Sequence, residues 1–238
     1  MNSPNNPTGS MYSPQEVQDI CMICRKYSFF IISDEIYSEL AHQNHVSFYK
    51  YYPEGTFVTG GLSKAHGGGG YRIGFLVLPK GLDLMHYFVK VASETYSCVS
   101  TLGQFAAVKA FSLDSSVDKS INDIADIMRI IISSFCEKLN HIGIQTTTHD
   151  GGFYVTAKLN LPQFKTSGEL ALMLLEQYNL GTLPGTAFGI PENELVLRLA
   201  IVDFDGEDVL IRYKNGEDIL KFIPQLDEAI EIFKVVLK

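Results

Sequence analysis

Four groups of residues carry side chains that could do chemistry, although they lie far apart in the sequence. In chain order they are Asn6-Pro7-Thr8-Gly9, Asp34-Glu35-Ile36-Tyr37, Ser63-Lys64 with Arg72, and Arg198. Taken singly, the first three are explained by a turn, a cap after a strand and a surface lysine. Arg198 differs because it lies inside an apolar run, and a buried guanidinium needs an anion from the protein or from a ligand.

The elements predicted around these groups in the first half of the chain form an α/β pattern. Ser13-Pro14-Gln15-Glu16 is a capping box and predicts a helix that begins at Pro14. Short apolar runs predict strands over residues 29–32, 57–59 and 75–78. The first run is apolar on both faces, which is typical of a buried parallel strand. Asp34 follows it, at the sheet edge where α/β proteins gather their ligands.

The second half of the chain changes to an α+β pattern. Residues 84–138 are predicted to be mostly helical, with a break over 114–120 and an amphipathic stripe over 121–139. The later elements predicted are strands at 145–148, 153–155 and 195–202, and helices at 167–177 and 224–237. We therefore predict an α/β part that ends near residue 115 and an α+β part over residues 116–238.

Composition narrows the class of partner. Lys and Arg number 19 and Asp and Glu 27, so the net charge is −8, which argues against nucleic acid or an anionic membrane as partner. No apolar stretch approaches the roughly 20 residues of a spanning helix, and the start of the chain lacks the features of a signal peptide. Four cysteines make no disulfide scaffold, so we expect a reducing compartment, the cytoplasm.

Together, the four groups resemble the class I/II aminotransferases, which use pyridoxal 5′-phosphate (PLP) and have fold type I. Residues 61–74 are similar to the signature of this family, in which Ser-Lys is followed by seven residues and then by Arg-x-Gly. The other motifs stand in family order and include Gly151-Gly152-Phe153-Tyr154, residues 183–189 and Leu197-Arg198-Leu199. The resemblance implies that residues 1–115 are the C-terminal part of the large α/β/α PLP-binding domain, and that residues 116–238 are the small C-terminal domain.

The resemblance also implies a role for each group around PLP. Lys64 would form the Schiff base with the cofactor and later move the proton between the substrate α-carbon and the cofactor. Asp34 would pair with the pyridine nitrogen, and Tyr37 and Asn6 would donate hydrogen bonds to the ring 3′-oxygen. Arg72 would hold the phosphate.

Further contacts follow from the same resemblance. Ser63 is a further candidate contact for the cofactor. Arg198, with Asn6 beside the substrate, would bind the α-carboxylate of an α-amino acid or a 2-oxo acid. Ser97 and Ser100 fall where dimers of the family lend residues to the neighbouring subunit, and the sequence leaves their role open. A homodimer is therefore expected.

The chain departs from the family pattern at two places. Gly61 stands three residues before the lysine, where many relatives carry a phosphate-binding serine. The Asn-Pro-Thr-Gly turn also follows Met1 almost at once, whereas family members have a long preceding segment with a phosphate loop at a helix N-terminus and a ring that stacks on the pyridine. The chain is therefore expected to be the C-terminal portion of such an enzyme.

Three functions remain open on the sequence. The first is PLP-dependent transamination, the second is a PLP lyase or synthase of the same fold, and the third is a non-catalytic remnant. Cys21-Met22-Ile23-Cys24 lacks a second Cys or His pair at zinc spacing, so we expect core packing and no metal. His66 is interpreted as a loop residue or as a contact near the lysine, because Lys64 already supplies the base.

Overall fold

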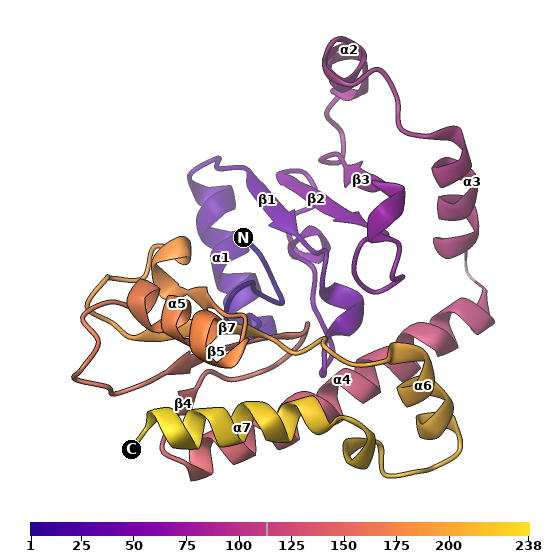
Figure 1. Ribbon diagram of the computed structural model, residues 1–238. Coiled ribbons are helices and arrows are strands. Elements are labelled where there is room, and N and C mark those ends of the chain that lie inside the picture. Colours follow the sequence, from indigo (N-terminus) through magenta and orange to yellow (C-terminus); the bar gives the residue numbers. More distant parts are fainter. Residues whose placement is uncertain (113) are drawn as a thin grey trace. The chain divides into compact units, whose positions relative to one another are not determined.

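The computed structural model describes residues 1–112 and 114–238, which form two compact units. The first unit holds residues 1–4 and 11–125, and the second holds residues 5–10 and 126–238 (Figure 1). The chain passes from one unit to the next inside helix α4 (Ser115–His141), beyond the predicted boundary at residue 115. Residues 5–10, which carry the Asn-Pro-Thr-Gly turn, belong to the second unit although they lie near the start of the chain.

The first unit is built on a three-stranded sheet with the order β1-β2-β3. Strand β1 (Ile31–Asp34) runs parallel to β2 (Thr56–Gly61), and β3 (Gly74–Val77) runs antiparallel to β2. The register sets Asp34 opposite Thr59. Because parallel neighbours end at the same sheet edge, the segments that follow β1 and β2 start close together.

Helix α1 (Pro14–Lys26) begins as the capping box predicts. Glu16 N donates to Ser13 Oγ at 3.2 Å, and Ser13 N donates to the Glu16 carboxylate at 2.7 Å. The helix buries Val17 and Cys21 against Ile31 and Phe48. Cys21 is therefore a core residue, as expected.

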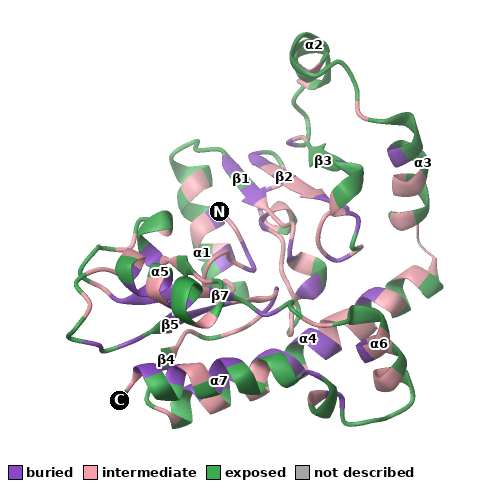
Figure 2. Ribbon diagram, viewed as in Figure 1, coloured by how far each residue is buried: buried purple, intermediate pink, exposed green. Residues whose placement is uncertain are grey.

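One prediction about β1 is wrong. The run 29–32 was expected to be buried on both faces, but Ile31 is 3% exposed while Ile32 is 63% exposed. Buried and more exposed residues alternate along β1, so the described residues cover only one of its faces (Figure 2). Strand β3 and helix α2 (Met85–Thr95) also bury none of their side chains.

The remaining helices of the first unit are short, apart from α4. Helix α3 (Thr101–Ala110) precedes α4, and three 3-10 turns occupy loops, η1 (Ser38–Leu40), η2 (Phe48–Lys50) and η3 (Gly69–Tyr71). The predicted break over 114–120 is wrong, because α4 begins at Ser115. The Asp114 carboxylate accepts from Ser116 N at 2.8 Å, so these polar residues cap the helix rather than interrupt it.

The second unit contains a four-stranded antiparallel sheet with the order β4-β5-β7-β6. Its strands are β4 (Gln145–Thr146), β5 (Tyr154–Lys158), β6 (Leu183–Pro184) and β7 (Val196–Ala200). Its other elements are α5 (Ser167–Tyr178), η4 (Gly185–Phe188), α6 (Gly206–Lys214), η5 (Ile219–Phe222) and α7 (Pro224–Val236). The strands and helices expected after residue 140 form with shifted ends. Helix α6 was not predicted, because its sequence is mostly polar.

The Asn-Pro-Thr-Gly turn is held in the second unit by backbone contacts. Gly9 O accepts from Asp150 N at 2.8 Å and from Gly151 N at 3.1 Å, and Thr147 Oγ1 donates to Thr8 O at 2.7 Å. Gly9 has a φ of +73°, and a Cβ there would lie 2.8 Å from Tyr154 O. Glycine is therefore required at this position.

The described residues contain neither a membrane-spanning helix nor a cluster of metal ligands. Across residues 1–112 and 114–238, no helix combines the length and the apolar character needed to cross a membrane. Within the same residues, His, Cys, Asp and Glu form no group of three that could hold a metal ion.

Candidate active site

Asp34 lies at the carboxyl end of β1, and one of its carboxylate oxygens is held in place. Oδ1 accepts from Thr59 Oγ1 at 3.2 Å and from Ile36 N at 3.4 Å. The Asp34 backbone also pairs with the start of the chain, since its N–H donates to Met1 O at 2.8 Å. Both side-chain contacts fall on Oδ1, so the carboxylate has a fixed direction and Oδ2 remains for a ligand.

Lys64 lies close to the segment that follows Asp34. Its Nζ atom is 5.6 Å from the centre of the Tyr37 ring, and Tyr37 is only 5% exposed. Lys64 belongs to the stretch that links β2 to β3, residues 62–73, which we call the lysine loop. Because β1 and β2 are parallel neighbours, Tyr37 and Lys64 both follow the same sheet edge. The structure thus places Lys64 next to Tyr37, which follows Asp34 by three residues.

The lysine loop turns sharply after Lys64. Gly68 N donates to Leu62 O at 2.8 Å, and a Cβ on Gly68 would lie 2.9 Å from the Leu62 Cβ. Gly61, where the sequence departs from the family, faces β3, and a Cβ there would lie 2.6 Å from Ile73 O. In this backbone, a side chain at position 61 would meet the backbone of Ile73 and Gly74.

Arg72 ends the turn in a left-handed conformation with a φ of +55°. Its Nη1 donates to Gly69 O at 2.9 Å, and among the described residues no carboxylate pairs with it. The side chain is exposed, whereas Ser63, beside Lys64, is half-buried. Arg72 is therefore a cation available to an anionic ligand.

Asn6 and Arg198 lie in the second unit and contact each other. Arg198 Nη1 donates to Asn6 Oδ1 at 3.0 Å, across 192 positions of sequence. The guanidinium carbon lies 4.1 Å from the centre of the Tyr154 ring and 5.0 Å from that of Phe188. Its Nε is buried and has no hydrogen-bond partner in the described part of the chain.

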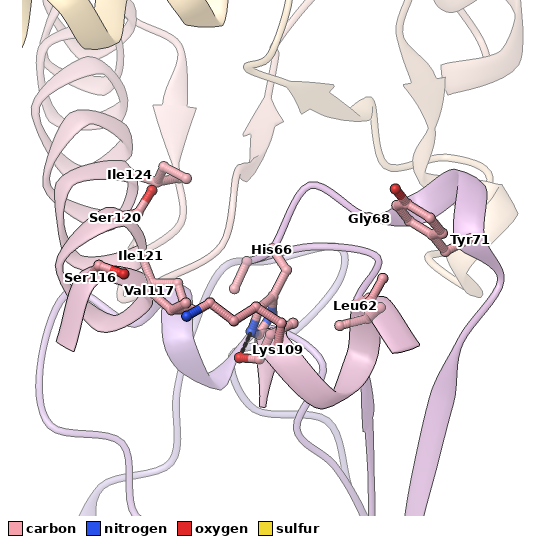
Figure 3. Close-up of a pocket in the computed structure, with 13 residues that line it drawn as sticks. Leu62, His66, Gly68, Tyr71, Lys109, Ser116, Val117, Ser120, Ile121 and Ile124 are labelled. Carbon is pink, nitrogen blue, oxygen red and sulfur yellow. Dashed lines mark hydrogen bonds between the residues drawn. The ribbon is translucent and has the colours of Figure 1, made fainter. Parts of the chain in front are cut away.

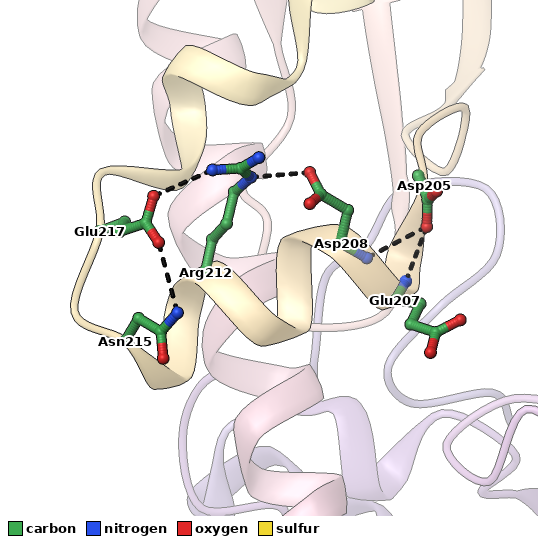
Figure 4. Close-up of polar contacts among 6 residues, drawn as sticks. All are labelled: Asp205, Glu207, Asp208, Arg212, Asn215 and Glu217. Carbon is green, nitrogen blue, oxygen red and sulfur yellow. Dashed lines mark hydrogen bonds and ion pairs between the residues drawn. The ribbon is translucent and has the colours of Figure 1, made fainter.

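Arg212 shows how a structural arginine of the same unit differs. Its Nε donates to Asp208 at 2.7 Å and its Nη1 to Glu217 at 3.0 Å (Figure 4). The two carboxylates raise the pKa of Arg212 and satisfy its charge. Arg198, in contrast, contacts an amide oxygen and two rings, and no carboxylate among the described residues. The described residues therefore offer Arg198 no acidic partner, and its role towards a ligand stays a prediction.

A pocket of about 360 Å³ lies beside the lysine loop. Figure 3 shows that it is bounded by the loop, α3 and the first turns of α4. The lining is mostly apolar, and its one lysine, Lys109, pairs with Asp114. None of the predicted site residues lines it, so the pocket is separate from the predicted cofactor residues.

Three contacts of the site were missed by sequence reasoning. Thr59 holds Asp34, and the rings of Tyr154 and Phe188 flank Arg198. Both rings stand within the motifs noted in the sequence, but their shared partner follows only from the fold. Ser100 caps α3 by accepting from Gly103 N at 3.5 Å, and its role towards a second subunit stays a prediction, as does that of Ser97.

Comparison with known proteins shows which family the chain belongs to. Residues 1–209 match the family described as aminotransferase class I and II. The chain is 34% identical over 197 residues to the probable N-acetyl-LL-diaminopimelate aminotransferase of Bacillus subtilis (strain 168). The aligned region covers 78% of this chain and 46% of the relative. It is 30% identical over 203 residues to the aspartate aminotransferase of Geobacillus stearothermophilus. The aligned region covers 81% of this chain and 50% of the relative.

Solved structures give the same result. The aspartate aminotransferase from Thermus thermophilus with maleate superimposes with a TM-score of 0.81 at 26% identity, over 100% of this chain and 56% of that one. The aromatic aminotransferase from Pyrococcus horikoshii OT3 gives 0.81 at 25% identity, over 99% and 58%. The chain spans about half the length of the curated relatives it matches. It belongs to the class I and II aminotransferases, a PLP-dependent family with fold type I.

Proposed function

We propose that this protein carries out PLP-dependent transfer of an amino group between an α-amino acid and a 2-oxo acid. The observation that carries the proposal is the position of the Lys64 amine, 5.6 Å from the centre of the Tyr37 ring and beside the strand end that holds Asp34. The matching relatives are named as aminotransferases, so we prefer transamination to a lyase reaction or a non-catalytic role.

The chemistry of the residues in the first unit fits PLP. An amine, a phenol, a carboxylate and a guanidinium match the aldehyde, the 3′-oxygen, the pyridine nitrogen and the phosphate of the cofactor. When bound, PLP supplies an electron sink that stabilises negative charge on the substrate α-carbon. Asp34 would keep the pyridine nitrogen protonated, and Thr59 would aim its carboxylate by holding Oδ1.

Lys64 would hold the cofactor through its amine and, once released, move the proton at the substrate α-carbon. Tyr37 is buried, so its hydroxyl would donate to the 3′-oxygen without competition from bulk water. Arg72 would pair with the phosphate through its planar fork, with Ser63 as a further donor.

Arg198 would bind the substrate carboxylate in the second unit, with Asn6 as its neighbour. Tyr154 and Phe188 flank the guanidinium, so they restrict its plane and remove water from it. A carboxylate binds a partly dehydrated guanidinium with a more favourable free energy than it binds a guanidinium in open solvent. Because the α-carboxylate is common to all amino acids, this contact serves any substrate of the class.

Other parts of the proposal follow from family membership. We propose a homodimer, with residues 1–115 as part of the large domain and residues 116–238 as the small domain. Small-molecule amino acids and 2-oxo acids would be its substrates. The cytoplasmic location stays a prediction.

The proposal is tested by finding which lysine PLP modifies. The purified protein is incubated with PLP and reduced with borohydride, and the modified peptides are mapped by mass spectrometry. Lys50 provides the matched control, because its Nζ lies 5.4 Å from the centre of the Tyr51 ring in the same unit. We expect Lys64 to be modified at much lower PLP concentration than Lys50, and Lys50→Ala to leave this unchanged. Equal modification of Lys50 and Lys64 would contradict the proposal.

A further inference from the structure

The lysine loop contacts the segment after β1 at two adjacent places. The first is Lys64 over the Tyr37 ring. The second lies two residues further along both segments, where His66 Nδ1 is 3.5 Å from a Glu39 carboxylate oxygen. Glu39 lies in η1, which begins directly after Tyr37. The His66–Glu39 contact therefore sits beside the contact that carries the proposed function.

His66 is also joined to a third element. Its Nε2 is 3.1 Å from the backbone oxygen of Ala110, the last residue of α3. A carbonyl only accepts hydrogen bonds, so Nε2 must carry a proton and donate. The ring also packs edge-on against Phe111 at a centroid distance of 5.2 Å. The His66 side chain is only 7% exposed. Its Nδ1 makes no hydrogen bond among the described residues, so it pairs with the Glu39 carboxylate only when the ring is protonated.

Polar contacts matter here because the surroundings of the loop are loosely packed. The pocket of about 360 Å³ adjoins the ring of His66 (Figure 3). Further along the loop, a Cβ on Gly67 or Gly70 would meet nothing within 4 Å. Glycines without neighbours leave the backbone free to move. Backbone hydrogen bonds from Gly67 N to Lys64 O and from Gly68 N to Leu62 O hold the turn itself, and His66 adds the contact that joins the turn to the end of α3.

We propose that His66 is a positioning residue that ties the lysine loop to η1 and to the end of α3, and so keeps the Lys64 amine over Tyr37. This inference rests on the proposed function, because it assigns His66 a purpose towards Lys64. His66 does not exchange the proton itself, since Nε2 is engaged by Ala110 O and Nδ1 faces Glu39. It acts only by holding the segment that carries the amine.

Four variants test the contacts of His66 one at a time. His66→Phe keeps a ring against Phe111 and removes both nitrogens, and His66→Gln retains a donor for Ala110 O. Glu39→Gln changes the other partner at an exposed position. His86→Phe is the matched control, because His86 is exposed in the same unit and its Nδ1 also lies near a carboxylate, at 3.9 Å from Asp83.

The first measurement is the ratio of PLP modification at Lys64 to that at Lys50 in the same sample. We expect His66→Phe to lower this ratio about three- to tenfold, the effect of losing one net hydrogen bond. Glu39→Gln should lower the ratio less. The double variant Glu39→Gln with His66→Phe should lower the ratio by less than the two single effects combined, because both residues act through one contact. His66→Gln should restore part of the loss, and His86→Phe should change nothing.

The second measurement needs no cofactor. Amide hydrogen exchange of Gly67 and Gly68 reports directly on the loop, and it should become faster in His66→Phe but not in His86→Phe. If the parent protein showed no preference for Lys64, the proposed function would fail, and the exchange rates would still decide the role of His66. Unchanged exchange in His66→Phe, or an unchanged Lys64-to-Lys50 ratio in a protein that does prefer Lys64, would overturn the inference. Glu39→Gln and His66→Gln serve if His66→Phe does not fold.

Discussion

Two arginines of the second unit illustrate how individual residues divide between function and stability. Arg212 is paired with Asp208 and Glu217 (Figure 4), and its guanidinium carbon lies 3.5 Å from the centre of the Phe222 ring. Arg198 is flanked by rings in a similar way but contacts an amide oxygen instead of an acid. A partly buried cation without an acidic partner lowers the stability of the folded protein unless a ligand supplies the opposite charge. This difference leads to opposite expectations for the two substitutions.

Arg198→Ala should impair substrate binding in the active enzyme and leave thermal stability nearly unchanged. Loss of a charge-assisted pair should raise KM about ten- to a hundredfold, for monocarboxylic and dicarboxylic amino acids alike. Arg212→Ala should instead lower the melting temperature, because it leaves two carboxylates without their cation. Steady-state kinetics and thermal denaturation measure the two effects. A lower melting temperature in Arg198→Ala with unchanged KM would show that Arg198 is a structural residue.

The cysteines offer a second test at the residue scale. Burial raises the pKa of the Cys136 thiol to about 11 and also raises that of Cys21, whereas Cys98 is exposed. Only the thiolate reacts with alkylating reagents. Iodoacetamide at mildly alkaline pH should therefore modify Cys98 quickly and Cys136 only after unfolding. Mass spectrometry over time measures this order, and rapid alkylation of Cys136 in the folded protein would contradict the described core.

At the scale of elements, local signals located most helices, while the sheets needed long-range information. The Ser13–Glu16 capping box correctly predicts the start of α1. The same kind of polar cluster at Ser115 and Ser116 was interpreted as a break, although it begins α4. A short polar stretch can cap a helix or interrupt it, and the decision depends on what the following apolar face packs against.

The cap of α1 should contribute measurably to stability. Ser13→Ala removes the acceptor for Glu16 N, and such a loss costs about 1 kcal/mol of the free energy of unfolding. Urea denaturation at neutral pH measures this value. Gln15→Ala is a suitable control, because Gln15 lies in the same turn and its side chain contacts only Asp19 among the described residues. An equal loss in both variants would mean that helix propensity, not capping, causes the effect.

The other half of the cap should depend on pH. The hydrogen bond from Ser13 N lowers the pKa of Glu16 below its usual value of 4.5. A carboxyl whose folded pKa is lowered contributes stability above the unfolded pKa, and this contribution is lost as the pH falls through the folded pKa. Glu16→Ala should therefore be less stable than the parent at neutral pH, and the difference should shrink below about pH 4. A difference that stays constant down to strong acid would contradict this assignment.

At the scale of the whole molecule, the first unit exposes more apolar surface than a monomer usually does. Ile32 on β1, Leu102 and Phe105 on α3 and Tyr87 on α2 are all more than half exposed (Figure 2). Exposed apolar side chains favour association where they lie next to one another. We therefore expect the isolated chain to associate with itself or to dissolve poorly.

The isolated chain should therefore exceed its monomer mass of 26.5 kDa in light scattering, and increasingly so as concentration rises. Leu102→Lys with Phe105→Glu should reduce the association, because both side chains point into solvent and the charges oppose contact between apolar faces. Leu172→Lys is a control for an exposed leucine of the second unit. A monodisperse monomer at all concentrations would contradict the expectation.

The sequence by itself determined what depends on short spacings. The capping box, the placement of Lys64 and Arg72 on one loop, and the position of Asp34 after an apolar run are all local patterns, so residue types over a few positions were enough. They also carried the resemblance to the aminotransferases, which the comparisons confirm.

Only the tertiary structure decided which distant groups meet. Asn6 reaches Arg198 because the turn at residues 5–10 joins the second unit. Thr59 reaches Asp34 because the register of β1 and β2 sets them opposite each other. His66 meets Glu39 and Ala110 because three elements pack around one loop. Strand register and the pairing of distant segments are selected by burial summed over the whole unit. No short stretch of sequence contains that information.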